Sequence, residues 1–201
     1  MGGGLARIAG FTMPTTPMPS KHTVTQEDVL FAVKQRLTEK KEAIVSGVSD
    51  VEASEAKDIA HLDVAGMVHS FDNYAINHVL KHHGNAKSEL ARGQLAITND
   101  DFNIIADVIN NPDYVIYGAK NQRKQDVIGK IKRLDDGSLL LIQEVRLGRK
   151  MLAMASMRKY PTAKNVESIA ASVLPTGKAD GGVSLIMVER ATGVKKSIQR
   201  G

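Results

Sequence analysis

Hydrophobic residues recur at two different spacings along the chain, and the change of spacing separates an early helical part from a later part with strands. The first predicted helix covers 25–48, where a capping pattern precedes hydrophobic residues three or four positions apart: Val29, Leu30, Val33 and Leu37. The acidic, alanine-rich stretch 49–66 is predicted as a short helix or a loop. A third helix is predicted over 71–83, with Ser70 as its N-cap, and a fourth over 99–110, with Thr98 and Asp101 as capping residues.

Beyond residue 112 the hydrophobic runs become short and rich in β-branched or aliphatic residues, which is typical of strands. Four strands are predicted, over 113–119, 124–134, 138–147 and 150–160, and "DDG" and "LGR" suit tight turns between them. The sequence therefore predicts an α+β fold, in which N-terminal helices pack on a four-stranded antiparallel sheet. A fifth strand is added if 183–190 joins the sheet. Between these, 165–173 is predicted as a short helix and 174–182 as a linker.

This pattern predicts four segments along the chain. Residues 1–22 are rich in glycine, proline and threonine without periodicity and are predicted as a flexible leader. An N-terminal helical segment follows over 23–67, then a main domain over 68–161, and finally an extension over 162–201 that ends in a basic tail. Since no apolar run approaches the ~20 residues of a spanning helix, we expect a soluble protein without a membrane partner.

Composition narrows the chemistry. The 201 residues carry a formal net charge of +5, which favours polyanionic partners such as nucleic acid. The chain has no cysteine, so disulfides and thiolate metal sites are excluded. Aromatic residues make up 4% of the chain, which leaves few rings for stacking on bases.

The stretch "NHVLKHHG", residues 77–84, holds half of the six histidines in the chain. His78 and His82 lie together at the edge of the hydrophobic arc of the predicted helix, and His83 lies nearer its centre, where it packs or caps the helix end. An imidazole can take or give a proton near neutral pH. A zinc pair is an alternative, although the glutamate of the His-Glu-x-x-His pattern is missing and a third ligand would have to be His69, His61 or a distant carboxylate. Unspecific surface histidines remain a third interpretation.

Strand alternation supplies the other charged candidates. If the polar faces of neighbouring strands coincide, they form one basic cleft from Lys130, Glu144, Ser156 and Arg158. Alternatively, each of these residues is solvated on a half-exposed sheet or forms a cross-strand pair.

The order of these elements resembles a known family. The run "NYAINHVLKHHGNAKSELARGQLAITNDDFNIIADVINNPDYVIY", followed by "IGKIKR", "LLLIQEVR" and "MLAMASMRKY", is similar to the phage-associated nuclease-like domains of the barnase, EndoU, colicin and RelE superfamily. Such domains include the C-terminal domains of Mu-type phage head morphogenesis (MuF) proteins and modules of polyvalent proteins. The resemblance covers 68–161. Because the chain has "KHHG" where the family has a "KHG"-like element, either His82 or His83 takes the family position.

The resemblance implies a barnase-like, metal-independent endoribonuclease of phage or mobile-element toxin type, without a cofactor, that cleaves RNA by attack of the substrate's own 2′-hydroxyl. It implies a catalytic set of His78, His82, His83, Glu144 and Ser156, and RNA contacts from Arg92, Lys130, Arg158, Lys159 and Tyr160. RNA is the implied partner, with an immunity or virion protein as a second, and the implied location is the cytoplasm of a bacterial host or the virion. We expect the helix-end imidazoles and the charged strands to share one pocket. The alternative is a catalytically inactive phage or virion-associated module that binds nucleic acid or protein.

Overall fold

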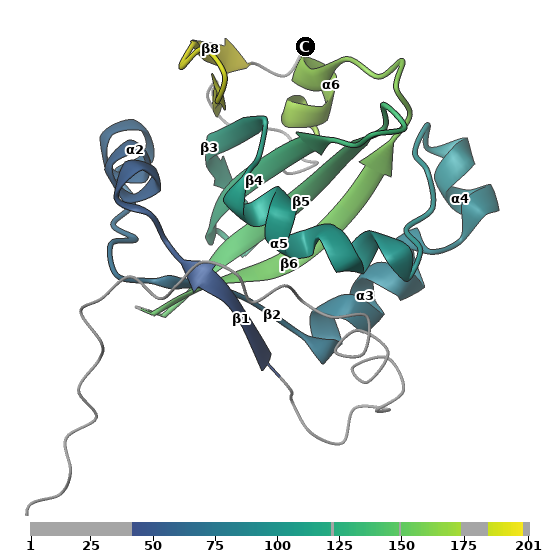
Figure 1. Cartoon of the computed structure of the whole chain (residues 1–201), viewed down its shortest axis with the longest axis horizontal. Coiled ribbons are helices and arrows are strands. Elements are labelled where there is room, and N and C mark those ends of the chain that lie inside the picture. Colours follow the sequence, from purple (N-terminus) through teal and green to yellow (C-terminus); the bar gives the residue numbers. More distant parts are fainter. Residues whose placement is uncertain (1–41, 122, 149, 174–184, 199–201) are drawn as a thin grey trace, which may run out of the picture.

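The structure is a computed structural model that describes residues 42–121, 123–148, 150–173 and 185–198. The predicted leader over 1–22, most of the first predicted helix, the linker over 174–182 and the end of the basic tail lie outside the described residues. The described residues form one eight-stranded sheet with helices on both faces, as Figure 1 shows.

The sheet has the strand order β1-β2-β6-β5-β4-β3-β7-β8. Its strands are β1 (Glu42–Gly47), β2 (Val68–Asp72), β3 (Tyr114–Lys120), β4 (Asp126–Arg133), β5 (Leu139–Leu147), β6 (Met151–Tyr160), β7 (Leu185–Glu189) and β8 (Lys195–Ile198). The α-helices are α2 (Asp50–Ala60), α3 (Asn73–His83), α4 (Ala86–Ala91), α5 (Ile105–Asn110) and α6 (Val166–Ala171), and a 3₁₀ helix, η1 (Asp100–Ile104), leads into α5.

The centre of the sheet is the antiparallel meander of β3 to β6. On one side, β2 runs parallel to β6 and β1 runs antiparallel to β2. On the other side, β7 and β8 continue the antiparallel pairing beyond β3. The sheet thus includes strands from segments on both sides of 68–161, namely β1, β7 and β8.

The predicted α+β class and the four meander strands are confirmed, but the predicted count of four or five strands is wrong. Residues 42–47 form β1 instead of extending the first helix, because Ile44 and Val45 suit a strand and the backbone pairs with β2. Residues 68–72 form β2, so the third helix begins later than predicted and its N-cap is Asp72 instead of Ser70. The Asp72 side chain accepts a hydrogen bond from Ala75 N at 2.7 Å.

The hydrophobic core lies on both faces of the sheet, in agreement with the alternation of β5. Leu140 and Ile142 pack on α3 and α5, on a side that we call the helix face. Farther along the helix face, α2 covers Ile128 and Leu152. Leu139, Leu141 and Val145 pack on the opposite side with α6, and we call this side the α6 face.

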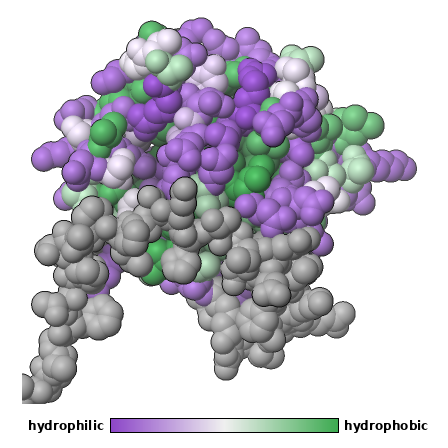
Figure 2. All heavy atoms as spheres, viewed as in Figure 1, coloured by the Kyte–Doolittle hydropathy of each residue, from purple (hydrophilic) through white to green (hydrophobic). Residues whose placement is uncertain are grey.

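The face of the molecule seen in Figure 2 is mostly polar. On the side seen in Figure 2, the described residues are largely hydrophilic and the hydrophobic ones form small separate groups. Among the described residues, no helix combines the length and the hydrophobicity needed to span a bilayer.

A β-bulge in β6 changes the face on which its side chains lie. Gln143 pairs with Ser156 while the next residue, Glu144, pairs with Met154, so Ala155 is an extra residue in β6. Paired residues share a face, which puts Met154 on the helix face with Glu144 but Ser156 on the α6 face with Gln143. Simple alternation along β6 therefore fails at this point.

Candidate functional site

The basic cleft expected from Lys130, Glu144, Ser156 and Arg158 does not form. Lys130 and Glu144 lie on the helix face. Ser156 and Arg158, paired with Gln143 and Leu141, lie on the α6 face because of the bulge at Ala155. The expectation that these four residues share one surface was wrong, and the structure separates them into two groups.

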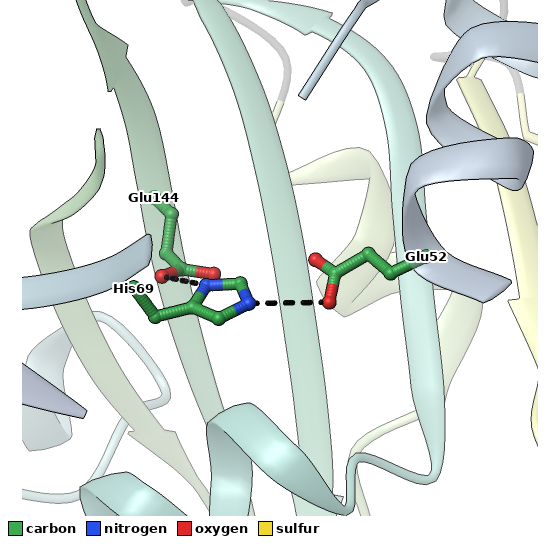
Figure 3. A group of neighbouring side chains, drawn as sticks. All are labelled: Glu52, His69 and Glu144. Carbon is green, nitrogen blue, oxygen red and sulfur yellow. Dashed lines mark hydrogen bonds and ion pairs between the residues drawn. The ribbon is translucent and has the colours of Figure 1, made fainter. Parts of the chain in front are cut away.

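Lys130 and Glu144 belong to a buried cluster with Glu52 and His69, which we call the buried tetrad. The ring of His69 lies between two carboxylates, with Nδ1 2.8 Å from Glu144 Oε1 and Nε2 3.2 Å from Glu52 Oε2 (Figure 3). The ammonium of Lys130 lies 3.0 Å from Glu52 Oε1 and 3.4 Å from Glu144 Oε2. It also donates a hydrogen bond to the carbonyl of Ile109, near the end of α5. The four side chains come from α2, β2, β4 and β5, and α5 contributes the carbonyl, so five elements meet at this cluster.

The charges of the buried tetrad support one another. Burial and the Lys130 ammonium would lower the pKa of His69, but the carboxylates of Glu144 and Glu52 together outweigh them and raise this pKa to about 9. Burial would likewise raise the pKa of Glu52, but Lys130 and His69 lower it to about 2. At neutral pH the imidazolium and the ammonium therefore balance two carboxylates, which is the condition for burying such charges.

The buried tetrad also contains the described group that most resembles a metal site. Glu52, His69 and Glu144 offer ligand atoms that all lie within 4.8 Å of one another. However, the Lys130 ammonium lies 3.4 Å from His69 Nε2 and beside both carboxylates, so these groups already surround a cation. A metal ion would have to displace that ammonium.

The buried tetrad is too enclosed for a substrate to reach it. The residue exposures are 0% for Lys130 and Glu144, 1% for His69 and 7% for Glu52. A phosphodiester cannot reach side chains so deeply enclosed. The arrangement instead links α2, β2, β4 and β5, so we assign it to the stability of the fold.

His78 and His82 lie far from such an environment, because both are exposed on the outer side of α3. Their ring centroids are 4.4 Å apart. Partial burial, followed by the charges of His82 and His83, lowers the pKa of His78. Glu144, with its partners His69 and Lys130, is fully enclosed, so the predicted pocket that joins it to these two imidazoles is absent.

His83 has a different environment, at the edge of the sheet beside β6. Its side chain is 12% exposed, and Nδ1 lies 3.1 Å from Oε2 of the buried Glu89. The other carboxylate oxygen of Glu89 lies 2.5 Å from Arg92 Nη1. We call His83, Glu89, Arg92 and Arg158 the edge cluster.

The backbone attaches the edge cluster to β6. Gly84 follows α3, and after α4 the chain returns so that Ile97 N donates to His83 O at 2.7 Å. Leu95 forms an isolated antiparallel bridge with Lys159, next to Arg158. These contacts hold the end of α3 beside the C-terminal end of β6. The positive charge of Arg158 on β6 lowers the pKa of His83.

The electrostatics of the edge cluster are unbalanced. Burial is the largest influence on His83 and lowers its pKa below the ordinary value; Glu89 opposes this shift, while Arg158 and Arg92 add to it. His83 Nε2 makes no hydrogen bond to any described residue. Within the described part of the chain, Arg158 has no carboxylate partner, and its Nε is buried without a hydrogen bond. A neutral imidazole thus lies beside a cation that lacks an anion.

The remaining predicted site residues are engaged elsewhere. Lys159 forms an ion pair with Asp101 at 2.8 Å, and Asp101 also accepts a hydrogen bond from Thr98 N at 2.8 Å, as expected for residues at a helix start. Tyr160 is 2% exposed in the core of the α6 face, and its hydroxyl lies 3.0 Å from Ser172 Oγ. Ser156 is partly exposed on that face.

The sequence analysis did not predict the contacts of three residues in these clusters. Glu52 and Glu89 carried no sequence signal, and His69 was considered only as a third metal ligand. The contacts of all three depend on elements distant in sequence or on a short helix that was not predicted. Only the structure shows that Glu89 is the single buried residue of α4.

Comparison with known proteins is consistent with this fold. A family model described as phage-Barnase-EndoU-ColicinE5/D-RelE like nuclease matches residues 46–167, which is more than half of the chain and includes both clusters. The chain belongs to this family of phage nuclease domains. No curated protein and no solved structure matches the chain.

Proposed function

We propose that this protein is a metal-independent endoribonuclease and that its reaction centre is the edge cluster. The observation that carries the proposal is that the chain from Leu95 to Ile97 connects the end of α3 to β6, with His83 within electrostatic range of Arg158. His83 Nε2 has no hydrogen bond to a described residue, and Arg158 has no carboxylate partner among the described residues. When the 2′-hydroxyl of RNA attacks the neighbouring phosphate, a base must remove the proton of that hydroxyl, and a cation must stabilise the negative charge that grows on the phosphate.

The proposed reaction takes place in one displacement. His83 Nε2 removes the proton of the 2′-hydroxyl, and the 2′-oxygen attacks the adjacent phosphorus. The bond from phosphorus to the 5′-oxygen breaks, and that oxygen leaves with a proton from water. The hydroxide so formed takes the proton from the His83 imidazolium, which restores the neutral base. The products are a 2′,3′-cyclic phosphate and a free 5′-hydroxyl, and the charge that grows on the phosphoryl oxygens is stabilised by Arg158.

Other side chains near the edge cluster suit the path of an RNA backbone. Ser156 lies two residues before Arg158 on the α6 face and is assigned as a hydrogen-bond donor to phosphate. Arg92 has a side chain that is 55% exposed. The exposed Lys164 places its ammonium 4.0 Å from the position of a Cβ on Gly93, next to Arg92. Arg92 and Lys164 add positive charge beside the edge cluster, in line with the net charge of +5 for the whole chain.

The biological setting is part of the same proposal. The family description names a phage nuclease that is similar to barnase, EndoU, colicin E5/D and RelE, and on that basis we propose a phage or mobile-element effector of toxin type that acts in a bacterial cell. Association with a virion, as in MuF-type proteins, and inhibition by an immunity protein follow from that setting as further expectations. An inactive binding module is the competing outcome of the test below.

The test is cleavage of a labelled RNA in EDTA by the wild type, His83→Ala and His78→Ala. We expect cyclic-phosphate ends from the wild type, a loss of about 10²- to 10⁴-fold for His83→Ala, and activity within two-fold for His78→Ala. His78 is a matched control because it lies on the same helix and is exposed. Cleavage that needs a divalent ion, or that survives His83→Ala, would refute the proposal. Salt-sensitive RNA binding without cleavage by the wild type would favour the binding module.

A further inference from the structure

Glu89 is a fully buried carboxylate on a short surface helix. Its exposure is 0%, whereas the other five residues of α4 are exposed. Burying a carboxylate is costly unless it is paired and hydrogen-bonded, so its partners should account for its position. Those partners are both in the edge cluster.

The two oxygens of Glu89 have separate partners. Oε2 lies 3.1 Å from His83 Nδ1, and Oε1 lies 2.5 Å from Arg92 Nη1. Arg92 in turn donates to the carbonyl of His82 at 3.2 Å, which ties the carboxylate back to the end of α3. The pair of contacts holds Glu89 on one side of the His83 ring and leaves the Nε2 side open.

The backbone after α4 fixes Glu89 in this orientation. Gln94 N donates to Glu89 O at 2.9 Å and Gly93 N donates to Leu90 O at 3.0 Å, which is the Schellman pattern of a helix end. The pattern requires a left-handed residue, and Gly93 has φ of +69°. The helix end that carries Glu89 and Arg92 is therefore rigid, and Leu95 then joins β6.

We propose that Glu89 is the positioning residue of the reaction centre: it accepts a hydrogen bond from His83 Nδ1–H, so that the unprotonated Nε2 faces the RNA. Because one ring nitrogen of a neutral imidazole carries the proton, fixing it on Nδ1 makes Nε2 the base. The same carboxylate stabilises the imidazolium that forms when Nε2 takes the proton. This inference rests on the proposed function, since it assigns a part to Glu89 in that reaction.

The first test needs no RNA. In the wild type labelled with ¹⁵N-histidine, NMR should show His83 as the Nδ1–H tautomer at a pH above its pKa. In Glu89→Gln the pKa of His83 should fall further, because the carboxylate that raises it is gone. Glu55→Gln is the matched control, since Glu55 also pairs with an arginine, with its Oε1 2.7 Å from Arg190 Nη1, but lies on α2. An Nε2–H tautomer in the wild type would overturn the inference.

The second test measures cleavage across pH. For Glu89→Gln we expect kcat/KM to fall by about 10- to 100-fold, the usual effect of removing the partner that orients a histidine, and the acidic limb of the pH profile to move to lower pH with the pKa of His83. Glu55→Gln should leave both unchanged. If Glu89→Gln fails to fold, the double variant Glu89→Gln/Arg92→Met removes both charges of the pair and is tested in the same way.

The two proposals fail in different ways. A wild type that cleaves no RNA refutes the proposed function, while the tautomer and pKa of His83 still report on the contact with Glu89. A wild type that depends on His83, together with a Glu89→Gln variant of unchanged rate, pH profile and His83 titration, refutes the part assigned to Glu89 alone.

Discussion

His69 and His83 both direct Nδ1 at the carboxylate of a glutamate, but their pKa values are shifted in opposite directions. Each directs Nδ1 at a buried glutamate, at 2.8 Å for Glu144 and 3.1 Å for Glu89. The pKa of His69 is nevertheless raised to about 9, whereas the pKa of His83 is lowered. The difference comes from the other neighbours of each ring: a second carboxylate, Glu52, lies beside the Nε2 of His69, while two arginines influence His83.

The comparison shows two different environments for the same residue type. In the buried tetrad every charge has an opposite charge beside it and water has no access, so the histidine is a fixed cation. In the edge cluster Arg158 has no carboxylate partner among the described residues and His83 Nε2 has no hydrogen bond to them, and we propose that this histidine exchanges a proton. The two histidines thus differ in whether the charges around them are balanced by neighbouring opposite charges.

The largest expected effect breaks the pairing of the buried tetrad. Lys130→Met removes the ammonium between two carboxylates, and the free energy of unfolding should fall by about 3–5 kcal/mol because an uncompensated charge stays buried. Lys120→Met is the control, since Lys120 pairs with Asp126 at an exposed position and should cost less than about 1 kcal/mol. Chemical denaturation measures both. A loss below about 1 kcal/mol for Lys130→Met would contradict a stabilising function.

The next effect breaks the edge cluster without breaking the fold. Arg158→Met should lower the rate of RNA cleavage by about 10²- to 10³-fold, as expected for losing a group that stabilises the transition state. Its stability should be unchanged or slightly higher, because the variant removes a buried Nε that has no hydrogen bond in the described structure. Single-turnover kinetics and thermal unfolding test both parts. Arg146→Met, on the neighbouring strand, is the control; equal loss in both variants would point to general electrostatic attraction.

Stability as a function of pH should sharpen the contrast between the histidines. The folded pKa of His69 is raised from 6.5 to about 9, so its contribution is full below pH 6.5 and is lost as the pH rises through 9. The folded pKa of Glu52 is lowered from 4.5 to about 2, so its contribution is full above pH 4.5 and is lost as the pH falls through 2. The tetrad therefore contributes most between pH 4.5 and 6.5.

The measurement is denaturation at several pH values. Between pH 6.5 and 9 the wild type should lose about 1–3 kcal/mol that His69→Gln does not lose. Parallel curves for the two proteins over this range would show that His69 is neutral in the folded state and would contradict the raised pKa.

The smallest expected effect concerns a residue that the sequence assigned to RNA contact. Tyr160→Phe removes the hydroxyl that lies 3.0 Å from Ser172 Oγ and should cost about 1 kcal/mol of stability. Because Tyr160 is 2% exposed in the core, cleavage should stay within two-fold of the wild type. A large loss of activity at unchanged stability would instead support the RNA contact that the resemblance implied for Tyr160.

The parts of the fold that could be predicted depend on local signals. The meander was predictable because each of its strands has a hydrophobic run and a turn signal next to it. β2 was missed because its five residues lead directly into α3, and its parallel partner β6 lies about eighty residues later in the sequence. β1 was missed for the same reason, since its pairing with β2 is what makes it a strand.

The site was predictable only as a set of residue types. The sequence placed histidines at the end of α3 but could not choose among them, because the choice depends on Glu89 and on the edge of β6. Lys130 and Glu144 were expected on a surface because charged side chains are seldom buried, and their partners Glu52 and His69 come from other elements.

The bulge at Ala155 makes β6 sensitive to its length as well as to its composition. A substitution there alters one side chain. Deleting the residue would remove the bulge: Met157 would stay on the helix face and Arg158 on the α6 face, but β6 would lose the bend and the added twist that the bulge gives it next to Arg158. Among relatives with the same site residues, we therefore expect substitutions at the position of Ala155 to be common and deletions of this position to be rare.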